Sequence, residues 1–194
     1  MPSRMLDTAA SPSDSRAPTS SASHAYTTRR CVRWALLAGA ACSAMTPAHA
    51  GPTGGKVTVG EASIHQIGDT TTINQSSQDL SLSWQSFNTS GDETINFVQP
   101  SSSAIAVNRI FDINGTQFMG KLNANGHVYL INPNGVLFGA GSQVNVGGLV
   151  ASTLDIDDAA LKGPVRQFSG AGTGSIVNRG DIAVARGGYV AFLG

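Results

Sequence analysis

Short apolar segments that alternate with Asn and Gly corners run through residues 51–194 and constrain the fold more than any other feature. Many of these segments carry β-branched side chains, and several alternate apolar with polar residues as a strand with one buried face does. The pairs between them tolerate the positive φ that tight corners need. No stretch of 12 residues or more repeats with a helical period, so the sequence predicts an all-β protein. The corner pairs are Asn114-Gly115, Asn125-Gly126, Asn134-Gly135, Gly147-Gly148 and Gly187-Gly188.

Regular spacing of these segments fits a sandwich, a barrel or a solenoid of short strands. The solenoid is favoured because successive units resemble each other, as Val128-Tyr129-Leu130 resembles Val190-Ala191-Phe192. With about 20 residues per coil, the 144 residues from Gly51 to Gly194 would form about seven coils. At about 4.8 Å per strand, such a rod would be about 34 Å long. One short helical turn is expected within Ser152–Leu161, with Asp155 or Asp157 near its start.

Residues 1–50 read as a leader with a secretory signal peptide. A basic cluster of Arg29, Arg30 and Arg33 precedes an uncharged run from Trp34 to Met45, and Ala48-His49-Ala50 forms an A-x-A cleavage site. The apolar run is too short for a membrane span, which needs about 20 residues. We therefore expect cleavage between Ala50 and Gly51. The twin-arginine route and lipidation at Cys42 are the alternatives left open.

Charge and composition of residues 51–194 exclude several classes of protein. This part has seven basic and ten acidic side chains, a net charge of −3, and no cysteine. Nucleic-acid binding is not expected, because it needs a basic patch that neutralises phosphates. The whole chain of 194 residues is 41% hydrophobic, which argues against a disordered protein. The absence of cysteine fits an exported protein that avoids periplasmic disulfide formation.

The motifs of catalysis and cofactor binding are missing. There is no G-x-S-x-G stretch, and His65 and His127, the two histidines after residue 50, lack the surroundings of a catalytic base. Asp155, Asp157 and Asp158 lack the glycine and glutamate of a calcium loop and are read as a solvated turn. Residues 170–175 do not match a phosphate-binding loop and are read as a corner between coils. No catalytic, cofactor or metal residue is predicted, and the protein is not expected to be an enzyme.

Several separated blocks of the sequence resemble one family in the right order. They are Trp84–Asn88, Glu93–Ser101, Ala106–Ile110, Gly120–Gly126, His127–Gly139 and Gly147–Ile156. The run resembles the two-partner secretion domain, the N-terminal haemagglutination-activity domain of filamentous haemagglutinin-like exoproteins, over about residues 55–194. Asn132-Pro133-Asn134-Gly135 corresponds to the family's best-known motif. The family's Asn-Pro-Asn-Leu motif is absent, which places the chain nearer the high-molecular-weight adhesin branch.

The resemblance implies a right-handed parallel β-helix, a single-stranded solenoid with an N-terminal cap. It implies a secretion-targeting and fold-nucleating domain, either as the N-terminal part of a longer exoprotein or on its own. The implied partners are the POTRA domains of an outer-membrane transporter and, during export, the Sec machinery. A host-cell surface receptor is a further candidate partner. The implied location is the exterior or the surface of a Gram-negative bacterium, reached through the periplasm.

The Asn132–Gly135 motif has two interpretations. Pro133 fixes its own φ and extends Asn132, so that Asn134-Gly135 can form a tight turn without touching any partner. Alternatively, Asn132, Pro133, Asn134 and Gly135 also bind the transporter. The four asparagines at 123, 125, 132 and 134 could stack as a ladder in adjacent coils. Trp84 and Phe87 are expected to seal the first coils.

Two other functions stay open at the level of sequence. One is an autonomous surface adhesin that binds host glycan or protein by itself. The other is a polysaccharide-degrading β-helix enzyme, which would need paired carboxylates on one face. The acidic residues of this chain are scattered, which disfavours the enzyme.

Overall fold

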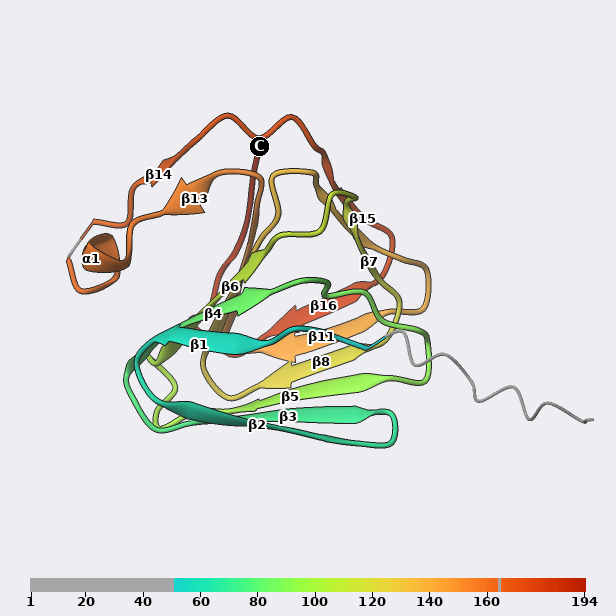
Figure 1. The fold of residues 1–194 in the computed structure, drawn as a ribbon, viewed down its shortest axis with the longest axis horizontal. Helices are drawn as coiled ribbons and strands as arrows, with labels where there is room; N and C mark the ends of the chain where they lie inside the picture. Colours follow the sequence, from blue (N-terminus) through green and yellow to red (C-terminus); the bar gives the residue numbers. More distant parts are fainter. Residues whose placement is uncertain (1–50, 164) are drawn as a thin grey trace, which may run out of the picture. The chain divides into compact units, whose positions relative to one another are not determined.

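Short strands connected by tight corners make up nearly all of the computed structural model, which describes residues 51–163 and 165–194 (Figure 1). The predicted signal peptide, including Ala50 of the cleavage site, lies outside the described residues. In the part of the chain that is described, no helix has the length and hydropathy that a membrane span requires. The first elements are β1 (Lys56–Val59), β2 (Ala62–Ile67), β3 (Thr70–Gln75), β4 (Asp79–Trp84), β5 (Thr94–Val98), β6 (Ile105–Ile110), β7 (Thr116–Phe118), β8 (Lys121–Ala124) and β9 (His127–Ile131). They are followed by β10 (Val136–Phe138), β11 (Gln143–Val146), β12 (Gly148–Ser152), β13 (Asp155–Ile156), α1 (Asp158–Leu161), β14 (Phe168–Ser169), β15 (Ile176–Asn178), β16 (Asp181–Val184) and β17 (Val190–Leu193).

Three sheets run along the stack of coils. The β4 sheet has the order β1-β4-β6-β9-β12-β17, the β5 sheet β2-β3-β5-β8-β11-β16, and the β7 sheet β7-β10-β15. Strands of successive coils pair parallel and in register, as β6 does with β4 and β9. The exceptions in these three sheets are β1 on β4 and β2 on β3, which pair antiparallel and cap the N-terminal end. The predicted parallel β-helix with an N-terminal cap is confirmed.

The predicted number of coils is wrong. The β4 sheet contains five strands in parallel succession within the described residues. Its aligned positions Leu80, Ala106, Val128 and Leu149 are 26, 22 and 21 residues apart, so most coils are longer than the assumed 20. The first residues form the antiparallel cap, and residues 153–175 leave the stack before it resumes at β15. Five coils at about 4.8 Å each give a stack of about 24 Å, which is shorter than expected.

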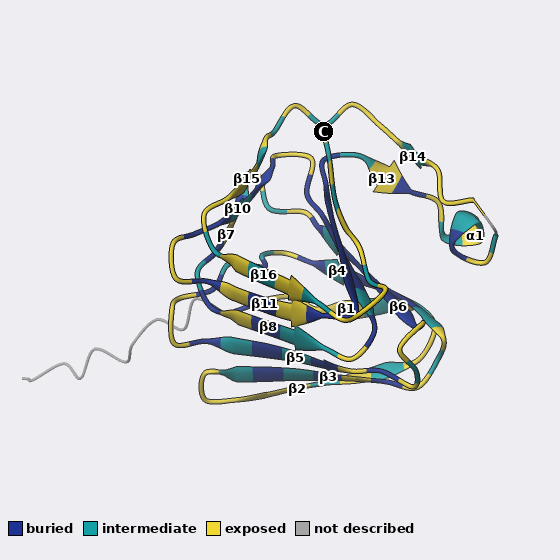
Figure 2. Ribbon diagram, turned by 180° about the vertical axis from the view of Figure 1, so that it is seen from behind, coloured by how far each residue is buried: buried dark blue, intermediate teal, exposed yellow. Residues whose placement is uncertain are grey.

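The inner cluster lies inside the coils, and buried and exposed residues alternate along strands such as β8 and β11 (Figure 2). Trp84 and Phe87 pack edge to face there with ring centroids 5.3 Å apart. The indole Nε1 of Trp84 donates to Asn108 Oδ1 at 2.9 Å, so its polar atom is satisfied although the ring is buried. Both aromatic residues lie in the first coil, as expected. The buried members of this cluster are Ile73, Leu80, Leu82, Trp84, Phe87, Ile95, Phe97, Ala106, Ile110, Phe118, Leu122, Val128, Leu130, Val136, Phe138, Val144, Val146, Leu149 and Ala151.

A second, outer cluster lies beneath the extrahelical segment, which comprises residues 153–175 with β13, α1 and β14. Its strands β13 and β14 pair antiparallel, and the segment extends to one side of the stack in Figure 1. Asp157 is the N-cap of α1 and its side chain accepts from Ala159 N at 2.8 Å, which confirms the predicted helical turn. The buried members of the outer cluster are Ile105, Val107, Tyr129, Ile131, Val150, Ile156 and Leu161.

A column of glycines before β9, β12 and β17 allows successive coils to approach closely. A Cβ on Gly147 would lie 2.7 Å from the carbonyl oxygen of Gly126, and one on Gly188 would lie 2.0 Å from that of Gly147. No side chain fits at these distances. The column Gly126, Gly147 and Gly188 therefore marks one fixed point in each turn of the chain.

Candidate partner-binding corner

Two loops of neighbouring coils stack at the corner between the β4 sheet and the β7 sheet, and we call residues 111–115 and 132–135 the corner. The Asn134 side chain donates from Nδ2 to the carbonyl of Asp112 at 2.8 Å. Where residues 153–175 rejoin the stack just before β15, the amides of Thr173 and Gly174 donate to the carbonyl of Pro133 at 3.2 and 3.0 Å. The predicted motif is thus held between the coils before and after it.

Asn132 is buried at the base of this corner and has no exposed surface. Its Nδ2 donates to the carbonyl of Asn114 at 3.1 Å and to Thr116 Oγ1 at 3.0 Å, while its Oδ1 accepts from Asn134 N at 2.9 Å. All three hydrogen bonds join the Asn132 side chain to other groups of the same domain. In the folded domain, Asn132 therefore offers no surface to a partner.

Gly135 closes the turn that the sequence predicts. Its amide donates to the carbonyl of Asn132 at 2.9 Å, and its φ is 102°. A Cβ at this position would also lie 2.6 Å from the carbonyl oxygen of Ser175. Both the backbone conformation and the space require glycine here.

The exposed half of the corner combines Pro133 and Asn134 with two apolar side chains that the sequence analysis did not select. Phe111 is 70% exposed and Ile113 is 87% exposed. They flank Asp112, whose carbonyl binds the Asn134 side chain. The signal in the sequence is Ile110-Phe111-Asp112-Ile113, of which Ile110 belongs to the inner cluster and ends β6. Phe111 and Ile113 follow the end of β6 and have no buried face to pack against, so their side chains reach solvent.

A shallow depression on the β7 sheet opens beside the exposed half of the corner. It is lined by residues of both corner loops and by the outward side chains of β7 and β10, including Gln117 and Leu137. Leu137 lies between Gln117 and Val177 in the parallel register of β7, β10 and β15. Together the corner and this strip form a surface that is mostly uncharged and partly apolar.

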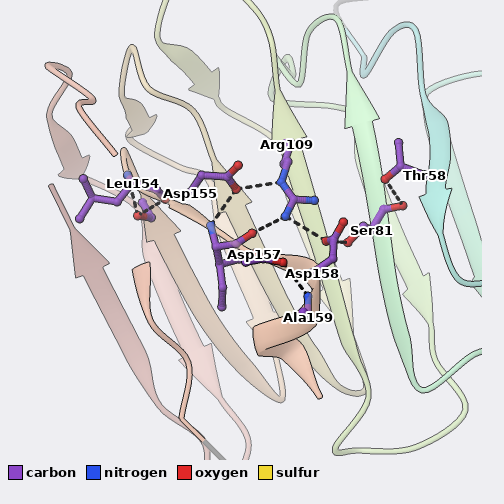
Figure 3. A network of polar contacts seen from close by, with 10 residues as sticks. Thr58, Ser81, Arg109, Leu154, Asp155, Asp157, Asp158 and Ala159 are labelled. Atoms are coloured by element: carbon purple, nitrogen blue, oxygen red, sulfur yellow. Dashed lines mark hydrogen bonds and ion pairs between the residues drawn. The ribbon is translucent and has the colours of Figure 1, made fainter. Parts of the chain in front are cut away.

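The acidic residues after β12 serve the packing of the extrahelical segment. Figure 3 shows Arg109 between Asp155 and Asp158, with Nε–Oδ1 and Nη2–Oδ1 distances of 2.8 and 2.9 Å. Asp158 also accepts from the Ser81 hydroxyl of β4. Among the described residues, no group of three or more His, Cys, Asp or Glu side chains converges as a metal site would require.

The two histidines of the described part lie far from these carboxylates in the chain and have different surroundings. His65 contacts Ser63 Oγ at 3.2 Å on the exposed strand β2. His127 begins β9, its ring stacks on Tyr189 at 5.2 Å, and its Nδ1 is buried without a hydrogen-bond partner. Burial, and then the charge of Arg166, lower the pKa of His127 below its ordinary value. Neither histidine contacts a nucleophile and an acid in the manner of a catalytic set.

The predicted asparagine ladder is wrong in its members. Asn123, Asn125, Asn132 and Asn134 belong to one coil, so they cannot stack on one another. The structure instead aligns Asn123 with Asn96 and Asn145 of the neighbouring coils. Equal positions in successive coils, rather than neighbours in the sequence, determine which side chains stack.

The family model described as the TPS secretion domain matches residues 48–194. The chain is 41% identical over 112 residues to a heme/hemopexin-binding protein of Haemophilus influenzae strain Rd, covering 58% of this chain and 12% of that protein. A second Haemophilus influenzae heme/hemopexin-binding protein is 41% identical over 101 residues, covering 52% of this chain and 11% of that protein. The chain therefore spans about an eighth or less of the length of these relatives.

A solved structure is also similar. The crystal structure of the HMW1 secretion domain from Haemophilus influenzae matches with a TM-score of 0.67 and 32% identity, covering 73% of this chain and 39% of that one. The sequence match and the structural match therefore point to the same kind of domain.

Proposed function

The chain belongs to the family of TPS secretion domains, which serve two-partner secretion, and from this we propose that its corner is the address that an outer-membrane transporter reads. Membership of the family implies an outer-membrane transporter as the partner in general. It also implies an extracellular or surface location for the exported protein. The finer statements below, on the site of recognition, the route and the payload, are our proposals.

Exposed apolar side chains beside the family motif are the observation that carries this proposal. Phe111 and Ile113 are 70% and 87% exposed, next to exposed Pro133 and Asn134. Large apolar side chains that cluster on a surface commonly mark a binding site, and aromatic residues are enriched at the centre of interfaces. We assign contact with the transporter's POTRA domains to these four residues. Asn132 and Gly135 hold the corner in shape beneath them.

The route and the larger protein follow from the sequence and the family. We propose export through the Sec machinery and cleavage after Ala50, which would leave Gly51 at the N-terminus. N-terminal sequencing of the exported protein checks the cleavage site, and a lipidated Cys42 at the N-terminus would contradict it. A role in nucleating the folding of a longer adhesin or other exoprotein belongs to the same proposal and rests on membership of the family.

A non-enzymatic role is also part of the proposal. The carboxylates of Asp155 and Asp158 are engaged by Arg109, and the family is defined by secretion. Binding of heme or hemopexin is named for relatives of which this chain covers about an eighth or less, and we attach neither ligand to this domain.

The decisive experiment separates recognition from folding. Replacement of both Phe111 and Ile113 by Ser removes exposed apolar surface, so the melting temperature should change little. Affinity for the isolated POTRA domains should fall about tenfold or more, equivalent to about 1.4 kcal/mol. The amount of protein in the medium should fall with it when the full chain and the transporter are co-expressed.

Two further variants serve as controls. Ile67→Ser changes an apolar side chain that is 82% exposed at the end of β2, and it should alter neither affinity nor secretion. Asn132→Ala should lower the stability by about 2–3 kcal/mol, because several buried hydrogen bonds are lost. If the Phe111/Ile113 variant binds the POTRA domains as well as the native protein does, the recognition site lies elsewhere.

A further inference from the structure

A column of three asparagines crosses the outer face of the β5 sheet. Asn96 on β5, Asn123 on β8 and Asn145 on β11 are aligned in the parallel register, with Thr72 of β3 preceding them. Asn123 Nδ2 donates to Asn96 Oδ1 at 3.0 Å, which fixes the orientation of both amides. The column runs along the stack, with one amide in each coil.

Hollows follow this column. One is lined by the three asparagines together with Thr72, Val98, Ala124 and Asn125. A second shares Ala124, Asn125 and Asn145 with the first and continues to Gly147, Ala183 and Ala185. Because they share residues, the two hollows form one groove that crosses β5, β8, β11 and β16, the neighbouring strands seen in Figure 1. We call it the amide groove.

Its chemistry is polar but uncharged. No residue that lines either hollow carries a charge. Asn145 is exposed, and the hydrogen bond between Asn123 Nδ2 and Asn96 Oδ1 does not involve Asn123 Oδ1 or Asn96 Nδ2. Donors and acceptors are therefore available at the coil spacing of about 4.8 Å, beside the small apolar side chains Ala183 and Ala185.

These properties restrict the kind of ligand. Phosphates of nucleic acids or lipids, and acidic glycans, would require cations, and the residues that line the groove supply none. The exposed Lys121 of β8 lies beside the column, two residues before Asn123, so a charged hexamer is included in the test below. An extended peptide would bind through a sheet edge, whereas the groove lies on a sheet face. A neutral sugar chain suits both features, because its hydroxyl groups donate and accept hydrogen bonds and its ring faces are apolar. The length of one β-linked hexopyranose along such a chain is close to the spacing of the coils.

We propose that the amide groove binds a linear, uncharged oligosaccharide whose chain follows the stack, with about one sugar for each coil. Asn123 and Asn145 bind the hydroxyl groups, and Ala183 and Ala185 contact the ring faces. The groove lies on the β5 sheet, whereas the corner lies between the β4 and β7 sheets. Sugar binding therefore does not depend on recognition by the transporter, and the two proposals can fail separately.

Titration of the purified exported protein with defined oligosaccharides tests the proposal. The probes are cellohexaose, β-1,4-mannohexaose and hexa-N-acetylchitohexaose, with a galacturonic acid hexamer as the charged comparison. Binding is followed by calorimetry and by shifts of the Asn side-chain amide signals in NMR spectra. We expect at least one neutral hexamer to bind with a dissociation constant of millimolar or below, and the charged hexamer to bind more weakly.

Matched variants locate the site. Asn145→Ala and Asn123→Ala should each weaken binding of that hexamer about tenfold or more. Gln143→Ala, an outward and exposed change on the same strand two residues before Asn145, should leave binding unchanged. Melting temperatures of Asn145→Ala and Gln143→Ala should match the native value, because both side chains are exposed. The proposal is overturned if no neutral hexamer binds, if the charged hexamer binds best, if the Asn variants bind normally, or if the face instead mediates self-association that sugars do not compete with.

Discussion

The inner and outer clusters are built from opposite faces of the same strands, yet they are enclosed in different ways. On β9, Val128 and Leu130 point into the coils, whereas Tyr129 and Ile131 point to the outer cluster. Three sheets of continuous chain surround the inner cluster. In the described part of the chain, the outer cluster packs against the extrahelical segment, which Arg109 fastens through Asp155 and Asp158.

This difference teaches that burial alone does not define how strongly a residue is coupled to the fold. Residues of both clusters are almost completely buried. Local opening follows the element that covers a surface, and elements with few supporting contacts open at lower free energy than the core. We therefore expect the outer cluster to open without unfolding of the coils, whereas the inner cluster opens only on global unfolding.

The largest effect is expected in the inner cluster. Phe118→Ala removes a fully buried ring that packs edge to face on Phe138 at 6.0 Å. Global stability should fall by about 3–5 kcal/mol, measured by denaturant unfolding. The neighbouring exposed change Gln117→Ala is the control and should have little effect. A loss below about 1 kcal/mol for Phe118→Ala would mean that the inner cluster is loosely packed and would break the comparison.

A smaller effect, local in extent, is expected for Leu161→Ala. Leu161 of α1 is 3% exposed and is the buried residue of that helix. The loss should be about 2–3 kcal/mol, near the low end for buried leucines. In hydrogen exchange, amides of residues 153–175 should exchange faster, while those of β5 and β8 keep their protection. Equal loss of protection in both regions would show that the clusters form one cooperative unit.

Removal of the fastening ion pairs should have a weaker effect still. The side chain of Arg109 is 16% exposed, but those of Asp155 and Asp158 are 56% and 35% exposed, so solvent screens the pairs. Arg109→Met keeps the aliphatic stem and should cost about 1 kcal/mol or less. Opening of the extrahelical segment should increase with salt in the native protein. The same salt dependence in the variant would assign the effect to other charges.

The smallest effect concerns pH and acts on the outer side of β9. The folded protein lowers the pKa of His127 through burial and the charge of Arg166, so the neutral ring is favoured. The stability that depends on the neutral ring is complete above the ordinary pKa of about 6.5 and is lost as the pH falls below it. His127→Asn should flatten this dependence in urea unfolding between pH 7 and pH 5. An unchanged slope would assign the acid sensitivity to carboxylates instead.

Strand alternation and glycine corners are local signals, and they were sufficient to predict an all-β protein and the turn at Asn134-Gly135 and to favour a solenoid. The parallel β-helix with an N-terminal cap was predicted from the resemblance to the family. Most residues on both faces of β6, β9 and β12 are apolar, with Asn108 and Arg109 of β6 among the exceptions. The pattern was visible in Val128-Tyr129-Leu130 but did not reveal the covering segment. The coil count failed because residues 153–175 leave the stack, which no local pattern marks. The role of Asn132 in the interior depends on Asn114 and Thr116 of the preceding coil, and such register between coils is fixed by the fold as a whole.

The glycine column of Gly126, Gly147 and Gly188 restricts how the length of the stack can change. Gly147 lies 21 residues after Gly126, and each glycine packs against the carbonyl of the one before it. Removal or duplication of one whole coil would restore the same contact, whereas a change of one or two residues within the coil would shift a side chain into a place where only hydrogen fits. The extrahelical segment is exempt, since it lies outside the repeating contact. Variation in chain length among proteins of this architecture should therefore come in two kinds: whole turns in the stack, and arbitrary insertions at positions equivalent to 153–175.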